Sequence, residues 1–220
     1  ETTEYDGTAK KPKVTADGLT EGIDFEVDYG SNVIPGEAFV VVTGKGKYWG
    51  QTKLYFTIDR CDISNIECVL GQQAIDYTGF EQYVDVEVGD LYYYSDYMVS
   101  YENNIDVGTA TVIVTGVNNY TGTIRKTFQI VPADISSYDI DLEYVNVGYD
   151  GTAKTPDITI YTRDLVLNTD YTVEYSNNVN IGTATVTISG IGNYKGTVAV
   201  YNYKTGEILC AVTAPTFDPD

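Results

Sequence analysis

The chain has 220 residues and a formal net charge of −19, from 32 acidic and 13 basic side chains. So negative a surface is repelled by nucleic acids and by anionic membranes, which excludes both as partners. A hydrophobic content of 43% with 21 tyrosines excludes a disordered acidic chain, because disordered chains contain few aromatic residues. No apolar run reaches the roughly 18–20 residues of a membrane-spanning helix, so we expect no membrane insertion.

Three landmarks recur along the chain in the same order. The first is a Tyr-x-Gly motif that begins at Tyr5, Tyr77 and Tyr149, so that successive copies lie 72 residues apart (77 − 5 and 149 − 77). The second is an Asp before an aromatic residue, with a tyrosine four residues further on: Asp24-Phe25 with Tyr29, Asp96-Tyr97 with Tyr101, and Asp170-Tyr171 with Tyr175. The third is a Gly-x-x-x-Tyr-x-Gly run that begins at Gly44, Gly116 and Gly190. A register held over the whole chain predicts a tandem array of three copies of one unit.

Within each copy the side chains alternate between apolar and polar. Residues 25–29 read Phe-Glu-Val-Asp-Tyr, and 97–101 and 171–175 largely repeat this pattern, which is typical of a strand with one buried face. The next strands are predicted at 38–42, 110–114 and 184–188, where Ala and β-branched residues share one face. Asparagines four residues before a glycine predict a turn with left-handed backbone between these strands: Asn32, Asn104 and Asn178. No stretch has an apolar period of 3.6 residues, so no helix is expected.

We therefore predict an all-β fold of three tandem immunoglobulin-like β-sandwich repeats, each with six or seven short strands, forming an elongated rod. The predicted boundaries are residues 1–59, 60–131 and 132–220, called the first, second and third copies. No Gly- or Ser-rich linker separates them, so semi-rigid joints are expected. The first copy is expected to be N-terminally incomplete. In the third copy, Asn202 and Lys204 replace a Phe and an Ile of the other copies, and residues 204–207 resemble a hairpin turn, which predicts an altered last strand.

Four motifs together resemble a known family. They are Tyr-Asp-Gly-Thr-Ala-Lys-x-Pro (5–12 and 149–156), Asp-Tyr-Thr-Val-Glu-Tyr-Ser-Asn-Asn (170–178), Gly-Thr-Ala-Thr-Val-Thr-Ile-Ser-Gly (182–190) and Gly-Asn-Tyr-Lys-Gly-Thr (192–197). These are similar to the bacterial immunoglobulin-like surface repeats of the MBG and YDG type, found in large surface and secreted proteins of Firmicutes. The resemblance implies an extracellular location, at the bacterial cell surface or secreted, and it supplies no catalytic residue and no ligand. The second copy departs from the pattern at Phe80, Gln82 and Val84.

The sequence offers little from which to build an active site. It contains no histidine, so no imidazole base and no Ser-His or Cys-His pair can form. Its acidic residues are scattered over alternating strand positions, which gives no localised carboxylate pair of the kind a glycosidase needs. We expect no enzymatic activity and no cofactor.

Two acidic residues occupy equivalent positions at the joints between copies. Asp62 and Asp134 are candidate ligands for a calcium ion, because hard cations bind several oxygen atoms that converge between modules. No Asp-x-Asp-x-Asp-Gly loop accompanies them. The competing interpretation is a structural or solvated role at the start of a strand.

The three cysteines, Cys61, Cys68 and Cys210, form no disulfide framework and lack the spacing of a zinc site. One extended strand from Cys61 to Cys68 would hold the two thiols too far apart for a disulfide, so this pair would require a turn between them. Whether any of the three forms a disulfide stays open.

Exposed aromatic rings can bind a carbohydrate by stacking on its sugar faces. The candidates are Trp49 and the run Tyr92, Tyr93 and Tyr94, because neither feature is shared by all copies. Trp49 lies at a turn position where the other copies have Thr and Lys. Alternate rings of a tyrosine run on a strand face inward, so core packing is the competing interpretation for Tyr92–Tyr94.

Two functional hypotheses follow. The first is a structural stalk, expected to be monomeric, that presents a neighbouring module of the same polypeptide. The second is an adhesin-like or carbohydrate-binding module that contacts an extracellular glycan or a host protein through copy-specific loops. The aromatic departures are scattered over the first two copies, which favours the stalk.

Overall fold

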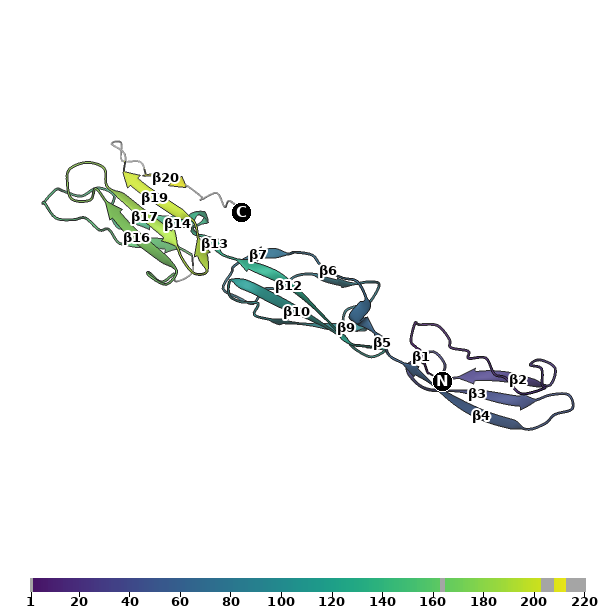
Figure 1. The fold of residues 1–220 in the computed structure, drawn as a ribbon. Helices are drawn as coiled ribbons and strands as arrows, with labels where there is room; N and C mark the ends of the chain where they lie inside the picture. Colours follow the sequence, from purple (N-terminus) through teal and green to yellow (C-terminus); the bar gives the residue numbers. More distant parts are fainter. Residues whose placement is uncertain (1, 163–164, 203–207, 213–220) are drawn as a thin grey trace. The chain divides into compact units, whose positions relative to one another are not determined.

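The computed structural model describes residues 2–162, 165–202 and 208–212 (Figure 1). They belong to two compact units, one formed by Glu1–Gly71, Val84–Glu102 and Thr111–Lys126, the other by Gln72–Tyr83, Asn103–Ala110 and Thr127–Asp220. Apart from two 3-10 helices of one turn each, every regular element of these described residues is a β-strand. The predicted all-β class is confirmed.

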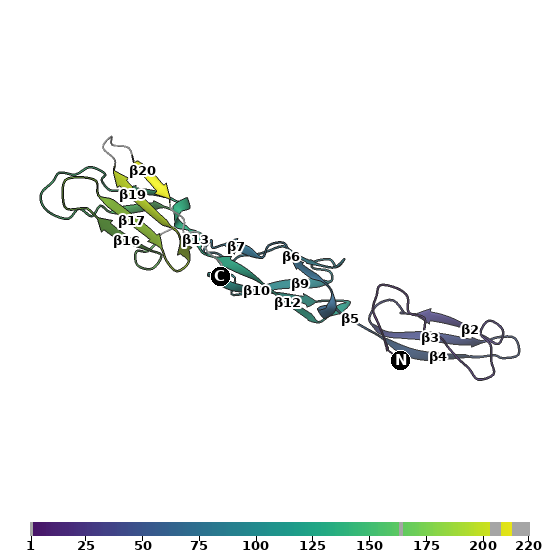
Figure 2. The same ribbon diagram turned by 45° about the horizontal axis from the view of Figure 1, so that its top comes forward.

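The first copy contains one four-stranded sheet. Its strands are β1 (Thr2–Glu4), β2 (Phe25–Gly30), β3 (Gly36–Gly44) and β4 (Gln51–Asp59), in the order β1-β4-β3-β2. Strands β2, β3 and β4 pair antiparallel and lie side by side in Figures 1 and 2, whereas β1 runs parallel to β4 at the edge. The described part of this copy therefore has fewer strands than the six or seven that the sequence predicted.

The second copy begins with two short elements. These are β5 (Cys61–Asp62) and the 3-10 helix η1 (Ile63–Asn65). The strands that follow are β6 (Cys68–Leu70), β7 (Ala74–Asp76), β8 (Val86–Val88), β9 (Tyr97–Glu102), β10 (Gly108–Gly116), β11 (Tyr120–Thr121) and β12 (Thr123–Val131). The larger sheet has the order β7-β12-β10-β9, and β6 pairs with β8. Strand β7 runs parallel to β12, as β1 does to β4.

The third copy opens in the same way, with β13 (Ala133–Asp134) and η2 (Ile135–Ser137). Its further strands are β14 (Asp139–Leu142), β15 (Ile158–Tyr161), β16 (Tyr171–Ser176), β17 (Thr185–Gly190), β18 (Tyr194–Lys195), β19 (Thr197–Asn202) and β20 (Ile208–Val212). The sheet order is β16-β17-β19-β20, and β20 pairs antiparallel with β19. The predicted hairpin turn at 204–207 lies outside the described residues, but the sheet edge does differ from the parallel edges formed by β1 and β7.

The predicted alternation of side chains is confirmed in the central strands. Ala110, Val112 and Val114 of β10 are all fully buried, and the residues between them are less buried. Strand β3 buries Ala38 and Val40, and β17 buries Val186 and Ile188. Successive side chains of a strand point to opposite faces, so one face of each sheet is covered and the other is more open to solvent.

An extended stretch after each Tyr-x-Gly motif is held to the sheet through its own backbone. In the first copy, Asn32 Nδ2 donates to the Lys10 carbonyl at 2.9 Å, and Lys10 N–H donates back to the Asn32 carbonyl at 2.7 Å. Tyr29 Oη donates to the Pro12 carbonyl at 2.5 Å. We call this set of hydrogen bonds the Asn/Tyr clamp. The other copies repeat it with Asn104, Gln82, Tyr101 and Val84, and with Asn178, Lys154, Tyr175 and Pro156.

The predicted turns with left-handed backbone follow strands β2, β9 and β16. The residue with positive φ is the one directly before each clamp asparagine: Ser31 at 53°, Asn103 at 56° and Asn177 at 54°. Asn and Ser tolerate this conformation better than bulky residues do. The clamp asparagine itself is therefore free to direct its side chain toward the extended stretch.

Asn104→Asp replaces the amide donor of the clamp with a carboxylate that faces the Gln82 carbonyl oxygen. We expect the free energy of unfolding to fall by about 1–3 kcal/mol, because a partly buried carbonyl loses its donor and meets a negative charge. Denaturant titration measures the change. Asn103→Asp is the matched control, since it makes the same charge change at the exposed neighbour and should cost less than about 0.5 kcal/mol. Equal losses in both variants would contradict the clamp.

Candidate functional site

The two joints between copies are built from the same short strand pairing. At the first joint, β5 pairs in parallel with β11, and Cys61 N–H donates to the Asn119 carbonyl at 3.1 Å. At the second joint, β13 pairs in parallel with β18, and Ala133 N–H donates to the Asn193 carbonyl at 3.1 Å. The first residues after each copy therefore pair directly with the third landmark of the next copy.

A tyrosine of one copy packs against a tyrosine of the next at both joints. The rings of Tyr5 and Tyr120 meet edge to face with their centroids 5.6 Å apart and an interplanar angle of 89°. Tyr77 and Tyr194 do so at 5.6 Å and 86°. Edge-to-face pairs of this kind contribute about 0.5–1.5 kcal/mol beyond the burial of their surface. The tyrosines of the first and third landmarks thus belong to one contact.

Asp62 and Asp134, the two calcium candidates, each cap a 3-10 helix at a joint. Asp62 Oδ1 accepts from the Ser64 N–H at 2.9 Å, and Asp134 Oδ1 accepts from the Ser136 N–H at 2.9 Å and from its hydroxyl at 2.7 Å. Ser64, through its backbone N–H, and Ser136, through its hydroxyl, lower the pKa of the respective carboxyl groups. Both carboxylates therefore favour the charged form that a cap requires.

The same carboxylates lie directly against a glycine. A Cβ added to Gly122 would lie 2.0 Å from Asp62 Oδ1, and one added to Gly196 would lie 2.3 Å from Asp134 Oδ1. Both glycines also have a φ of +85°, which side chains rarely adopt. Glycine at the end of the third landmark is therefore required by its backbone and by the joint.

The structure gives Asp62 and Asp134 a structural role. Over residues 2–162, 165–202 and 208–212, no group of three or more Cys, Asp or Glu side chains is placed to hold a metal ion. Calcium binding at the joints stays a prediction of the sequence.

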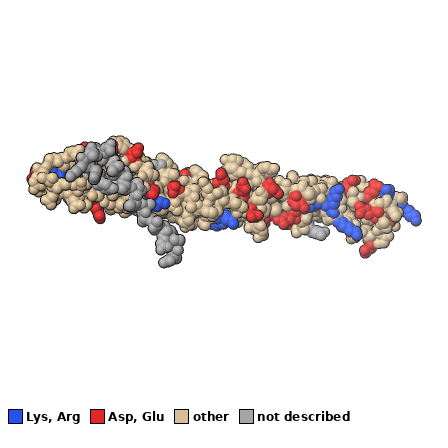
Figure 3. Space-filling view, turned by 90° about the horizontal axis from the view of Figure 1, so that it is seen from above, with Lys and Arg blue, Asp and Glu red and all other residues tan. Residues whose placement is uncertain are grey.

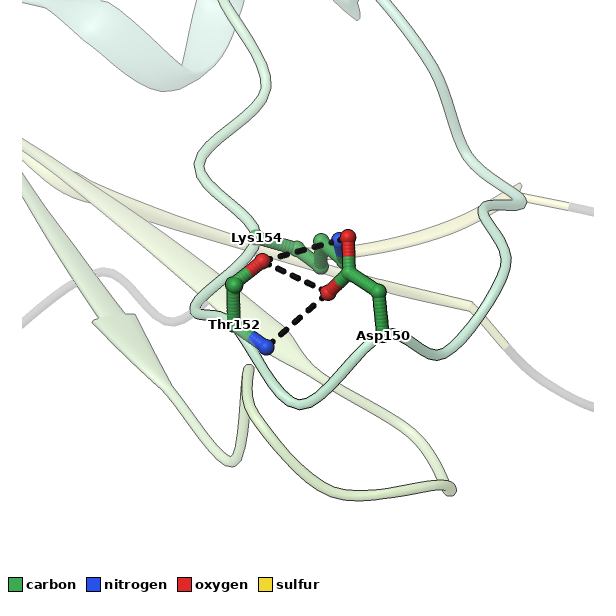
Figure 4. A network of polar contacts seen from close by, with 3 residues as sticks. All are labelled: Asp150, Thr152 and Lys154. Carbon is green, nitrogen blue, oxygen red and sulfur yellow. Dashed lines mark hydrogen bonds and ion pairs between the residues drawn. The ribbon is translucent and has the colours of Figure 1, made fainter.

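The Tyr-Asp-Gly-Thr-Ala-Lys motif of the third copy forms a compact polar turn (Figure 4). Asp150 Oδ1 accepts from the Thr152 N–H at 2.9 Å and from its hydroxyl at 2.6 Å, and Asp150 Oδ2 lies 2.6 Å from Lys154 Nζ. Lys154 and Thr152 together hold the pKa of the Asp150 carboxyl far below its usual range. Asp6 in the first copy has equivalent partners. The motif is therefore accounted for as a turn.

Tyr92–Tyr94 form a turn rather than a strand. Asp96 Oδ2 accepts from the Tyr92 N–H at 2.9 Å, and the Asp96 N–H donates to the Tyr92 carbonyl at 2.8 Å. The side chains of Tyr92, Tyr93 and Tyr94 are 74%, 45% and 68% exposed. The core-packing interpretation of this run is therefore wrong, because it assumed a strand. The rings of Tyr93 and Tyr94 lie 3.9 Å apart at an angle of 34° and present an aromatic surface to solvent.

Tyr94 occupies a backbone position that suits a smaller residue. Its φ is +66°, and the equivalent residues Gly22 and Asn168 also have positive φ. A side chain with a Cβ costs about 1–2 kcal/mol in this conformation. Strain of this kind gathers at functional positions, so the exposed tyrosine turn is the strongest ligand-binding candidate in the second copy.

Trp49 is 93% exposed in a turn of the first copy, as the sequence predicted. It lies in a different copy from the tyrosine turn. The two aromatic candidates therefore belong to separate loops.

Cys61 and Cys68 are free thiols separated by the η1 turn. Burial raises the pKa of both, which lowers the thiolate fraction that reacts. The side chain of Cys210 lies outside the described residues.

An open cavity of about 410 Å³ in the third copy was not predicted. Leu142, Ile181 and Val186 contribute apolar lining. Strands β17 and β19 have six residues each, whereas β10 and β12 have nine, so the pairing is shorter beside the cavity.

Asp and Glu side chains are interspersed with Lys and Arg over the visible face in Figure 3 and form no single dense patch there. In the part of the chain that the structure describes, no helix has the length and apolar character needed to cross a membrane.

No protein-family model matches the chain, and no curated protein matches its sequence. The resemblance to bacterial immunoglobulin-like surface repeats therefore stays an expectation that the motifs carry.

Gly122→Ala tests the joint between the first and second copies. The new Cβ would collide with Asp62 Oδ1, so we expect the free energy of unfolding to fall by about 1–3 kcal/mol more than in Gly50→Ala. Gly50 is the matched control, because its φ is +98° and a Cβ there meets no atom within 4 Å. When Asp62→Ala is added to each variant, the additional loss of unfolding free energy in Gly122→Ala should disappear. Denaturant titration of the four variants measures it, and equal losses at Gly122 and Gly50 would show that the contact is unimportant.

Proposed function

We propose that the chain is a non-catalytic spacer built from three immunoglobulin-like β-sandwich repeats, residues 1–59, 60–131 and 132–220. It would present a neighbouring module of the same polypeptide outside a bacterial cell, at the surface or in a secreted protein. The observation that carries this proposal is the recurrence of one joint. The Tyr5–Tyr120 and Tyr77–Tyr194 pairs have the same centroid distance, and each accompanies the same two-residue strand pairing.

A spacer has to keep its two ends apart. Joints in which the neighbouring copies pack against each other serve this purpose better than flexible linkers. One residue, Arg60, separates β4 from β5, and one residue, Pro132, separates β12 from β13. A flexible linker would need several Gly or Ser residues at these places. The proposed array is therefore semi-rigid and elongated.

Composition and resemblance support the remaining parts of the proposal. The chain has no histidine, and its acidic side chains are scattered, which supports a non-catalytic role. Its net charge of −19 favours solubility and disfavours association between separate molecules of the chain, in keeping with a monomer. The extracellular location rests on the motif resemblance alone, and antibody labelling of intact cells that produce the chain tests it.

The spacer proposal predicts a narrow distribution of distances across the first joint. Lys47 and Lys126 are each replaced by a non-natural amino acid that carries a spin label. Pulsed electron paramagnetic resonance then measures the distribution of distances between the two labels. Tyr120→Ala should broaden the distribution, because it removes the ring that packs on Tyr5. Tyr55→Ala, which removes an exposed tyrosine of β4, is the control and should leave the width unchanged. A broad distribution in the unaltered chain would mean independent copies and would refute the spacer.

The second candidate function is carbohydrate binding, and the tyrosine turn favours it. Three consecutive tyrosines are exposed, and the middle and last rings lie with their centroids 3.9 Å apart and their planes tilted by 34°. Aromatic rings displayed in this way stack on the apolar faces of sugars. Tyr94 keeps a strained backbone that Gly or Asn would relax, which is the pattern expected of a residue kept for binding.

Tyr94→Asn separates binding from stability. We expect the free energy of unfolding to stay equal or to rise by up to about 1 kcal/mol, because Asn tolerates the left-handed conformation. Retention on insoluble polysaccharides or on a glycan array should fall if the turn binds sugar. Tyr55→Phe is the control for an exposed tyrosine elsewhere. Absence of retention for the unaltered chain on every glycan would refute this second function.

A further inference from the structure

The sequence contains three Asp-Gly pairs, at residues 6–7, 17–18 and 150–151. Glycine has no Cβ, so its backbone nitrogen is accessible to the side chain of the aspartate before it. A new bond between this nitrogen and the aspartate Cγ closes a cyclic succinimide, and the amide proton and the carboxyl hydroxyl leave together as water. Water then opens the ring. Opening at the main-chain carbonyl produces isoaspartate, in which the backbone runs through the side-chain carbons.

Two of the three pairs belong to the polar turns of the Tyr-Asp-Gly-Thr-Ala-Lys motif, which hold the carboxylate by both oxygens. Asp6 Oδ1 accepts from the Thr8 N–H at 2.8 Å and from its hydroxyl at 2.6 Å, and Asp6 Oδ2 lies 2.6 Å from Lys10 Nζ. Asp150 has the same three contacts (Figure 4). These contacts have to break before the carboxyl carbon can turn toward the glycine nitrogen.

The lysines of these turns are held in place as well. The side chains of Lys10 and Lys154 are only 14% and 20% exposed, and Lys154 Nζ also donates to the Thr152 hydroxyl at 3.1 Å. A fixed ammonium group favours the ionised carboxylate, and its contact is the main reason why the pKa of Asp6 and of Asp150 is low. The ionised form closes the succinimide more slowly, because it lacks the hydroxyl that leaves as water. The turn therefore opposes the reaction through both geometry and charge.

The remaining pair, Asp17-Gly18, lies in an open turn. Leu19 N–H donates to the Ala16 carbonyl at 3.0 Å, so Asp17 and Gly18 are the two central residues of the turn, and both are exposed. Within the described part of the chain, the Asp17 carboxylate has no hydrogen-bond or ion-pair partner. No atom lies within 4 Å of the position that a Cβ of Gly18 would occupy. Nothing in the surroundings therefore restrains this carboxyl group or covers the glycine.

We propose that Asp17-Gly18 is the site at which the folded chain forms isoaspartate, and that the polar turns protect Asp6 and Asp150 from the same modification. Water is the only other reactant. Isoaspartate adds one carbon to the backbone within the turn, so the bond between Leu19 and Ala16 should be lost. The change lies between the clamped stretch of the first copy and β2. This proposal is independent of the spacer function.

The test ages the full chain at physiological pH and temperature and follows each Asp-Gly pair by peptide mapping. Electron-transfer fragmentation in the mass spectrometer distinguishes isoaspartate from aspartate. In the folded chain, isoaspartate should accumulate at Asp17 about five-fold or more faster than at Asp6 or Asp150, because hydrogen bonds to a charged group have to break at the other two. In denaturant the three pairs should react at similar rates, since the turn contacts are then absent.

Lys154→Met removes the ammonium group from one turn and leaves the turn at Asp6 as an internal control in the same molecule. Isoaspartate at Asp150 should then rise toward the level at Asp17, while Asp6 stays protected. Circular dichroism establishes that the variant is folded, and Thr152→Val, which removes only the hydroxyl donor, takes its place if it is not.

Asp17→Glu should abolish the modification at this position, because glutamate has to close a larger and less favourable ring. Three results would overturn the proposal. They are the absence of isoaspartate at Asp17 in the folded chain, equal rates at the three pairs before denaturation, and an unchanged Asp150 in a folded turn variant.

Discussion

The Asn/Tyr clamp is the constraint on which the rest of each copy depends. The stretch that it holds contains no strand, so its carbonyl groups need donors from elsewhere. The amide of Asn32 and the hydroxyl of Tyr29 supply them, and their counterparts do so in the other copies. Because both donors reach backbone oxygens, the side chains of the stretch can vary. This explains how the second copy keeps the clamp with Gln82 and Val84 in place of Lys and Pro.

The parallel edge strands β1 and β7 determine where the joints form. Tyr5 precedes the clamped stretch of the first copy, and Tyr77 precedes that of the second. The Tyr5 N–H donates to the Asp59 carbonyl at 2.9 Å, and the Tyr77 N–H donates to the Val131 carbonyl at 2.8 Å. These bonds hold each ring where it meets the tyrosine of the following copy. Two landmarks that look independent in the sequence, the Tyr-x-Gly motif and the Gly-x-x-x-Tyr-x-Gly run, are thus parts of one interface.

Much of the fold could be predicted, because strand alternation is a local property. The buried face of Ala110, Val112 and Val114 follows from a period of two, and the landmarks reveal where that pattern restarts. The tyrosine turn could not be predicted in the same way. A run of three tyrosines has the composition of a strand, and only the bonds between Tyr92 and Asp96 show that it turns. The role of Asp62 was also hidden, because a carboxylate at a joint has the same sequence pattern whether it caps a turn or binds a cation.

The sheet edge of the third copy is formed by a different strand from that of the other two copies. Strands β1 and β7 pair in parallel with the end of the strand that leads into the next copy, so sheet edge and joint use the same segment. In the third copy the pairing partner is β20, which runs antiparallel to β19. The stretch equivalent to β7, around residues 146–148, then forms no strand and lines the cavity instead. The cavity therefore lies beside the stretch whose counterpart forms the parallel edge strand of the second copy.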